Sequence, residues 1–456
     1  MSIHVWRQAQ TQSTINNFYE EDMNIFKPRR NARGNSDGVF RMEFPIMQWF
    51  IACLYKIFGN HLLITRLFMF VTGLVTVIGI YRLLDELFNQ PVLSAIGAWA
   101  FNFSPGFYYY TINPLPDNFA LCFSVWGLVF FFMWYKQNKL FRLLISSLLL
   151  SIGTLSKLPF IIYYIVPVTY FIDKMIRNGV HRKDILSLCA AISFSLLPIT
   201  WYLMVIPQWN GNVIVHGMLN NQDSVAKLFD YYQHNLISTL PEILIGYGSV
   251  IFFLAGFYFL VKNKAYQNPK FLPLAALGVM AIVYYLFEAN AIARVHDYYL
   301  FPFYPILFIL VAYGAFQFYT GTSKFKRYLT YLLLLAIPVS CYLRMQGRWN
   351  NDSPGFNKDL LTYKTELQNA VPKDALVIAG NDDSQFVMFY YIDKKGWGFD
   401  NDQLTPEMLR TMIDQGAQYL YSDSEKINNN LELSPYFDAL VLQKGSFRIY
   451  SLKKTI

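Results

Sequence analysis

Some ionisable side chains stand at the ends of long apolar stretches, where they could bind an anion. Lys157 separates two such stretches, and a lone cation in apolar sequence is typical of a side chain that pairs with a phosphate. The alternative is a lysine whose ammonium group extends to a membrane interface. Arg294 lies just before another apolar stretch, and we expect it to contact the same phosphate as Lys157.

Two carboxylates stand where they could accept a proton. Glu43 lies just before the apolar segment 46–58. A carboxylate within hydrogen-bond reach of a hydroxyl or an amine can act as a general base, whereas a carboxylate at a helix start can simply be stabilised by the positive end of that helix. Asp117 follows Pro116 at the start of another apolar stretch, where capping of backbone amides is the alternative to a role in a site.

A third group of polar side chains could bind a substrate. His296 could pair with its neighbour Asp297 as a base, or it could only hydrogen-bond the surrounding loop. Arg7 and Gln8 offer hydrogen-bond donors for phosphate or hydroxyl groups. Their alternative is to anchor the chain at an interface beside Trp6.

The elements that must position these groups are apolar stretches that fill most of residues 61–344. The chain is 54% hydrophobic, 18% aromatic and 15% charged, which is rare in soluble domains. We interpret the stretches as about ten membrane-spanning helices. Clusters of Lys and Arg occupy alternate loops, which the positive-inside rule makes cytoplasmic, so the remaining loops and both chain ends lie on the outer face. The net charge of +8 then reflects contact with anionic lipid headgroups rather than nucleic acid.

The composition divides the chain into three segments. Residues 1–60 form an outer-face loop with two interfacial amphipathic helices, one capped by Thr11 or Ser13 and one over 46–58. Residues 61–344 form the transmembrane bundle, and residues 345–456 alternate strand-like and helix-like patterns, which predicts a small α/β domain on the same outer face. An outer-face start also predicts a further apolar helix upstream of His4 in the complete gene product.

Short motifs along residues 4–320 occur in the order seen in a known superfamily. They are Trp6-Arg7-Gln8, Asn17-Phe18-Tyr19, Glu43-Phe44-Pro45, Gln48-Trp49, Phe58-Gly59, Pro114 to Asp117, Gly153 to Lys157, and His296-Asp297-Tyr298-Tyr299 before Pro302 and Pro305. Together they resemble the polytopic C-type glycosyltransferases, in particular the protein-mannosyltransferase-like and RgtA/B/C/D-like branch, which is similar to glycosyltransferase family 39.

The resemblance implies an all-α polytopic membrane bundle in a bacterial inner membrane that transfers a sugar, with inversion, from a polyprenyl-phosphate donor. The acceptor would be a periplasmic protein, lipid or polysaccharide, and the other partners would be membrane lipids. Tyr298 would join the cations and polar groups named above in binding substrate. Such families usually carry an acidic residue in the first outer loop as general base. Here that stretch reads Trp6-Arg7-Gln8-Ala9-Gln10, so we expect Glu43 to be the base, with Asp117 as the next candidate.

Other functional classes stay open. About ten spans with polar ends could form a lipid or solute transporter, although no duplicated halves are visible and the ionisable residues gather at the outer boundary. The missing acidic pair also allows a non-catalytic relative that only binds polyprenyl lipid. Neither the four cysteines nor the acidic pair Asp382-Asp383 has the spacing of a metal site. We therefore expect no metal and no cofactor.

Overall fold

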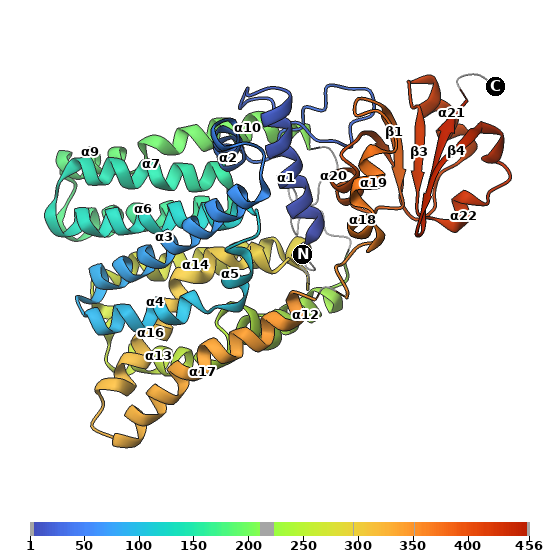
Figure 1. The fold of residues 1–456 in the computed structure, drawn as a ribbon. Helices are drawn as coiled ribbons and strands as arrows, with labels where there is room; N and C mark the ends of the chain where they lie inside the picture. The colour runs from blue at the N-terminus through green and yellow to red at the C-terminus, as the bar shows by residue number, and fades with distance from the viewer. Residues whose placement is uncertain (1–3, 210–222, 295, 351, 454–456) are drawn as a thin grey trace. The chain divides into compact units, whose positions relative to one another are not determined.

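The computed structural model describes residues 4–209, 223–294, 296–350 and 352–453. The chain divides into two compact units, and each is described by itself. The terminal unit consists of Met1–Arg41, Gln48–Ile64 and Arg348–Ile456, and the helical unit consists of Met42–Met47 and Thr65–Gly347. Figure 1 shows helices throughout the helical unit and a single sheet in the terminal unit.

The helical unit is made of apolar helices joined by short turns. The elements are α3 (Leu62–Phe88), α4 (Pro91–Asn102), α5 (Pro105–Tyr110), α6 (Pro116–Gln137), α7 (Leu140–Ser156), η1 (Leu158–Tyr164), α8 (Ile165–Asn178), α9 (Arg182–Ile192), η2 (Ser193–Ser195), α10 (Leu196–Val205), η3 (Ile206–Gln208), α12 (Val225–His234), η5 (Asn235–Leu244), η6 (Tyr247–Ser249), α13 (Val250–Lys262), η7 (Ala265–Gln267), α14 (Phe271–Phe287), α15 (Ala289–Ile292), η8 (Asp297–Phe303), α16 (Tyr304–Thr320) and α17 (Lys324–Arg348). Several of them begin with Pro in the first turn. Backbone N–H groups in the first turn form no hydrogen bond within the helix, so a proline without an N–H is tolerated there.

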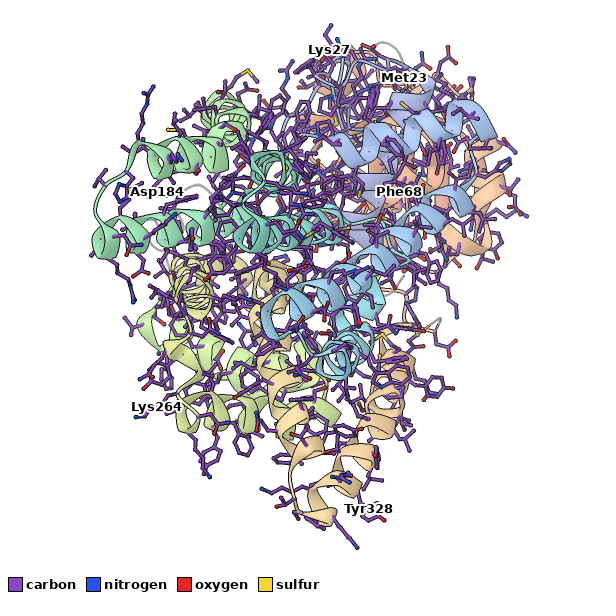
Figure 2. The ribbon with its side chains drawn as sticks, turned by 90° about the vertical axis from the view of Figure 1, so that its left-hand side faces the viewer. Met23, Lys27, Phe68, Asp184, Lys264 and Tyr328 are labelled. Carbon is purple, nitrogen blue, oxygen red and sulfur yellow. The ribbon has the colours of Figure 1, made fainter. Side chains whose placement is uncertain are left out.

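Large apolar side chains cover the outside of the helical unit as well as its core. Leu254 and Leu335 are 61% and 68% exposed. The exposed ring of Tyr328 on α17 extends from the surface in Figure 2. A helix with apolar side chains on all sides suits hydrocarbon, because its backbone groups are satisfied internally and its side chains need no water.

The prediction of about ten spans is reproduced only in part. Among the described residues, six helices are long and apolar enough to cross a membrane, namely Leu62–Phe88, Pro116–Gln137, Leu158–Asn178, Arg182–Gln208, Asp297–Thr320 and Lys324–Arg348. The pair Val225–Leu244 and Tyr247–Lys262 is bent by 96°, and Ile46–Phe58, Leu140–Ser156 and Phe271–Phe287 are shorter apolar helices. One of the apolar stretches interpreted as a span, over residues 92–110, is broken between α4 and α5, because Pro105 forces Ser104 into an extended conformation. The mostly helical, apolar architecture is confirmed, and the span count stays a prediction.

Helices α6 and α7 approach each other closely. A Cβ added to Gly153 on α7 would lie 2.3 Å from Ser124 Oγ and 3.0 Å from the carbonyl oxygen of Ala120 on α6. The hydroxyl of Ser146 on α7 donates to the carbonyl oxygen of Gly127 on α6 at 2.7 Å. Small residues allow this close approach, which fixes the end of α7 against the start of α6.

The terminal unit contains a five-stranded sheet in the order β2-β1-β3-β5-β4. Its elements are α1 (Val5–Glu20), α2 (Ile46–Phe58), α18 (Asp359–Thr362), α19 (Lys364–Asn369), β1 (Leu376–Gly380), α20 (Val387–Ile392), β2 (Lys395–Gly398), α21 (Pro406–Asp414), β3 (Tyr419–Ser422), α22 (Glu425–Asn428), η9 (Ser434–Tyr436), β4 (Phe437–Lys444) and β5 (Phe447–Leu452). Strands β2, β1 and β3 are parallel, with Ile378 opposite Trp397 and Leu420, while β5 is antiparallel to both β3 and β4. This confirms the predicted small α/β domain.

The N-terminal segment packs on this domain within the terminal unit. Val5 and Ala9 of α1 belong to the same apolar core as Leu360 and Val387. The amide N–H groups of Arg33 and its successor in the chain donate to the carbonyl oxygen of Gly396 at 2.9 and 2.7 Å, which extends the sheet beyond its edge strand β2. Helix α2 has the bounds predicted from the sequence.

The carboxylate of Glu21 forms ion pairs within the N-terminal segment and with strand β2 of the sheet. Its carboxylate accepts hydrogen bonds from Arg29 at 3.1 Å and from Arg33 at 3.0 Å, and it pairs with Lys395 on β2. Burial raises the pKa of the Glu21 carboxyl, but the hydrogen bonds and charges of Arg33 and Lys395 outweigh it and lower the pKa to about 2. Glu21 is therefore ionised at neutral pH.

The predicted start of the first amphipathic helix is wrong. Helix α1 begins at Val5, after His4 in a left-handed conformation with φ 51°. Thr11 and Ser13 lie inside it, and the Thr11 hydroxyl donates to the carbonyl oxygen of Arg7 at 2.8 Å. A Thr or Ser hydroxyl can bond the preceding helical turn as readily as it caps a helix, so these residues did not mark its start.

Candidate functional site

A cavity of about 310 Å³ lies in the helical unit at the level where α7 and α14 end. Its lining combines apolar side chains with a few ionisable groups. The lining residues are Met42, Glu43, Lys157, Leu158, Pro159, Ile161, Ile162, Tyr202, Trp209, Tyr284, Phe287, Glu288 and Tyr299. A mostly apolar cavity with a small number of placed polar groups is typical of ligand sites. We call it the helical-unit cavity.

Lys157 is the cation of the lining. It ends α7 in an extended conformation, and its backbone N–H donates to the carbonyl oxygens of Gly153 and Thr154. The side chain is 10% exposed, and its ammonium nitrogen lies 3.7 Å from Asp117 Oδ2 and 4.8 Å from the centre of the Tyr299 ring. The carboxylate and the ring offset the loss of water around the ammonium group. Lys157 is thus buried inside the unit.

Asp117 holds Lys157 from the neighbouring helix. It is 1% exposed and is the second residue of α6, whose cap residue is Leu115. The close packing of α6 on α7 brings the start of one helix to the end of the other, so the ion pair joins them. A buried carboxylate near a helix start is also favoured by the helix dipole. The structural and functional interpretations of Asp117 are both compatible with this placement.

Glu43 also lines the cavity, in a short segment held by three contacts. The N–H of Phe44 donates to the carbonyl oxygen of Leu155 at 2.9 Å. The Phe44 ring packs edge-on against Trp201 at 4.7 Å, and Trp201 Nε1 donates to the carbonyl oxygen of Met42 at 3.0 Å. These contacts fix the half-buried Glu43 before α2 begins at Ile46.

Glu288 is a second carboxylate of the helical-unit cavity that the sequence did not single out. It directly follows the last residue of α14, so it lies outside that apolar helix. Burial raises the pKa of its carboxyl to about 7, a value that suits a group exchanging a proton near neutral pH. Its signal in the sequence is a lone carboxylate immediately after an apolar run. Only the fold shows that it shares a cavity with Glu43.

Arg294 does not line this cavity. Its guanidinium pairs with the carboxylate of Asp230 on α12 through both Nε, at 2.8 Å, and Nη2. Both side chains are about half exposed. The structure therefore does not bring Arg294 together with Lys157, and among the described lining residues Lys157 is the single Lys or Arg.

The motif at 296–298 lies near Lys157, whose ammonium nitrogen is 5.7 Å from the centre of the Tyr298 ring. Asp297 accepts a hydrogen bond from the hydroxyl of Tyr110 at 3.0 Å, and Tyr298 is fully buried with its ring edge-on to Tyr110. His296 Nδ1 lies 2.7 Å from the carbonyl oxygen of Ala291, which fits the loop-bonding interpretation. These three residues are close to Tyr299 in the chain but are not themselves lining residues.

Arg7 and Gln8 belong to the terminal unit. Both are buried on α1, and Arg7 Nη1 donates to the side-chain oxygen of Gln10 one turn away. Their role in substrate binding stays a prediction.

The bundle of apolar helices and the small α/β domain define the fold of the chain. The fold is that of the C-type glycosyltransferases, and the resemblance expected from the short motifs is confirmed. Residues 43–202 match the sequence family described as dolichyl-phosphate-mannose-protein mannosyltransferase, and this segment includes Glu43, Asp117 and Lys157. No curated protein matches the chain.

Solved structures of this fold resemble the chain over nearly its whole length. ArnT from Cupriavidus metallidurans in the apo state has a TM-score of 0.66 at 11% identity, with 99% of this chain and 96% of that chain covered. The same protein bound to undecaprenyl phosphate has a TM-score of 0.63 at 13% identity, covering 98% and 96%. The oligosaccharyltransferase AglB from Archaeoglobus fulgidus, in complex with an inhibitory peptide and a dolichol-phosphate, has a TM-score of 0.60 at 12% identity, covering 94% and 66%.

Proposed function

We propose that the chain is a membrane glycosyltransferase that transfers a sugar from a polyprenyl-phosphate donor to an acceptor on the outer face of a bacterial inner membrane, with inversion. The observation that supports this most is the helical-unit cavity, where buried Lys157 shares one lining with Glu43 and Glu288. A group-transfer site of this kind needs a cation for the leaving phosphate and a carboxylate for the acceptor proton. Similar proteins in complex with undecaprenyl phosphate and dolichol-phosphate support the class of donor.

Lys157 binds the phosphate of the donor in this proposal. When the bond between the anomeric carbon and the phosphate oxygen breaks, negative charge develops on the phosphate, and a buried ammonium group stabilises it more strongly than water does. Asp117, 3.7 Å away, orients the ammonium group before the donor arrives. Polyprenyl phosphate is the leaving group.

Glu43 accepts the proton of the acceptor hydroxyl or amine as the new glycosidic bond forms. Attack on the face opposite the phosphate inverts the anomeric carbon, so base and cation must contact the substrate from different sides. Glu43 precedes α2 and Lys157 ends α7, and both line the same cavity, so both can contact one substrate. Glu288 either assists Glu43 or replaces it as base. The raised pKa of Glu288 distinguishes these two roles, because a base with this pKa makes the rate depend on pH near 7.

The orientation belongs to the same proposal, with the cavity and the terminal unit on the periplasmic side. Cysteines introduced at Asn35 and Asn138 test it with an impermeant thiol reagent added to intact cells. Labelling at Asn35 and protection at Asn138 are expected, since Asn138 lies among the basic residues between α6 and α7. The reverse pattern would invert the proposed topology.

A lipid-handling protein without transfer activity is the second candidate, because the helical unit also contains an apolar cavity of about 610 Å³ between η5, α13, α14 and α16. The test incubates membranes that contain the chain with a panel of polyprenyl-phosphate sugars and measures free polyprenyl phosphate. Release from one donor supports transfer. Binding or movement of the lipid without release supports the second candidate.

A further inference from the structure

The terminal unit contains a cavity whose lining shares no residue with the helical-unit cavity. It has a volume of about 350 Å³ and is formed by segments far apart in the chain: α1, the stretch before α18, the loops after β1 and β3, and α20. Its lining residues are Val5, Trp6, Gly355, Phe356, Asn357, Leu360, Asn381, Asp382, Asp383, Ser384, Val387, Met388 and Asp423. We call it the terminal-unit cavity.

The cavity lies at the carboxyl ends of two parallel neighbours in the sheet. Strand β1 ends at Gly380 and is followed by Asn381, and strand β3 ends at Ser422 and is followed by Asp423. Crevices outside the carboxyl ends of parallel strands are the usual ligand sites of open α/β sheets. The position agrees with a binding role for this cavity.

The polar part of the lining is fixed by its own hydrogen bonds. Asp423 accepts from the N–H of Asn381 at 2.8 Å and from Asn357 Nδ2 at 2.7 Å. Asp382 accepts from the N–H of Ser384 at 3.0 Å and from that of Met388 at 2.9 Å. Each of these carboxylates keeps lone pairs for a further donor, so the rim is preorganised to accept hydrogen bonds from a ligand.

Asp383 adds a carboxylate that the protein itself does not engage. It is exposed, and no hydrogen bond or ion pair to it occurs among the described residues. The lining thus carries three carboxylates and, among the described residues, no Lys, Arg or His. This charge favours a cationic or neutral ligand and disfavours a phosphate or another anion.

Trp6 supplies an aromatic wall. Its ring stacks on Phe386 with centroids 6.4 Å apart and an interplanar angle of 27°, which fixes the plane of the indole. An aromatic face beside carboxylate oxygens suits a sugar ring, because the ring presents C–H groups on its faces and hydroxyl groups at its edges. An ammonium substituent would gain from both the carboxylates and the indole face.

We propose that the terminal-unit cavity binds a saccharide that carries an amino group, through residues other than those that line the helical-unit cavity. Among the described residues, no three His, Cys, Asp or Glu side chains converge in a way that could hold a metal ion. The inference goes beyond the proposed function and does not depend on it.

The test uses the full chain in detergent micelles and saturation-transfer NMR with glucosamine, glucose and glucose 6-phosphate as probes. We expect the strongest transfer to glucosamine, weaker transfer to glucose and none to glucose 6-phosphate. Asp383→Asn should weaken glucosamine binding by about three- to tenfold, because it removes one charge and leaves the rim intact. Asp414→Asn, at an exposed carboxylate that ends α21 outside the cavity, is the matched control and should change nothing.

Several outcomes would overturn the proposal. Absence of glucosamine binding would do so, as would equal binding of the three sugars that is unchanged in Asp383→Asn. Displacement of glucosamine by Ca²⁺ would indicate a cation site. Binding of lysine amide as tight as that of glucosamine would indicate a peptide site. Trp6→Phe, which keeps an aromatic ring, should retain glucosamine binding. None of these readouts depends on sugar transfer.

Discussion

Replacement of Lys157 by Met removes the cation that we assign to the donor phosphate while keeping a long apolar side chain. In the wild-type chain the ammonium nitrogen lies 3.7 Å from Asp117 Oδ2 and above the ring of Tyr299. A hydrogen bond to a charged group is worth about 1.5–3 kcal/mol, and about 1.4 kcal/mol corresponds to tenfold in rate. We therefore expect Lys157→Met to slow sugar transfer by about 10- to 100-fold.

The same substitution takes the cationic partner from Asp117, which is 1% exposed. Breaking one side of a buried ion pair costs about 3–5 kcal/mol of stability, so a loss of activity in the single variant could reflect a loss of folded protein. The double variant Lys157→Met with Asp117→Asn removes both charges and should recover most of that stability. With Asp117→Asn alone, the set forms a double-mutant cycle.

The assay measures transfer at limiting and saturating donor together with the thermal midpoint of each variant. We expect the double variant to be nearly as stable as the wild type and still slow, with a raised donor requirement. Arg294→Met is the matched control. Arg294 and its partner Asp230 are both about half exposed and do not line the cavity, so transfer should stay within about threefold of the wild type. A stable double variant with wild-type kinetics, or a defect in Arg294→Met equal to that of Lys157→Met, would refute the assignment of the phosphate to Lys157.

Three further predictions concern carboxylates. Glu43→Gln should lower turnover by about 10² to 10⁴ and leave donor binding nearly unchanged; turnover within a few-fold of the wild type would move the base to Glu288. If Glu288 must be ionised, kcat/KM rises with pH through about 7, and pH-dependent kinetics of Glu288→Gln should show a flatter rise. The folded carboxyl also holds its proton more tightly than the unfolded one. The free energy of unfolding should therefore fall as the pH rises from about 4.5 to about 7. The pKa of Glu21 is lowered in the folded chain, so the stabilising effect of Glu21 is complete above about pH 4.5 and is lost as the pH falls toward 2. Glu21→Gln should therefore lower the thermal midpoint at pH 7 and make the midpoint less sensitive to acid. Equal acid sensitivity of the wild type and the variant would contradict this prediction.

The sequence predicted those parts of the fold that local signals mark. Pro45 and Gly59 bracket an apolar run, and α2 spans the interval between them as expected. Lys157 was recognisable because a cation inside apolar sequence needs a partner, and the structure supplies Asp117. The alternating strand and helix patterns after residue 345 likewise predicted the α/β domain.

The remaining features depend on contacts between distant parts of the chain. Pairing of Arg294 with Asp230 cannot be read from spacing, since 64 residues separate them. Glu288 lies in the same cavity as Glu43 only because the end of α14 comes close to the segment before α2. The break after Ser104 is an exception, because it follows from the local effect of Pro105 on the residue before it.

The most direct test of the central claim is the amount of polyprenyl phosphate released per sugar transferred, measured with the purified chain in liposomes, a panel of polyprenyl-phosphate sugars and envelope extract as the source of acceptor. We predict equal amounts of released carrier and transferred sugar from one donor, and a strong loss of both in the variant that combines Lys157→Met with Asp117→Asn. Absence of release from every donor, although the lipid binds to the chain or crosses the bilayer, would contradict a glycosyltransferase function.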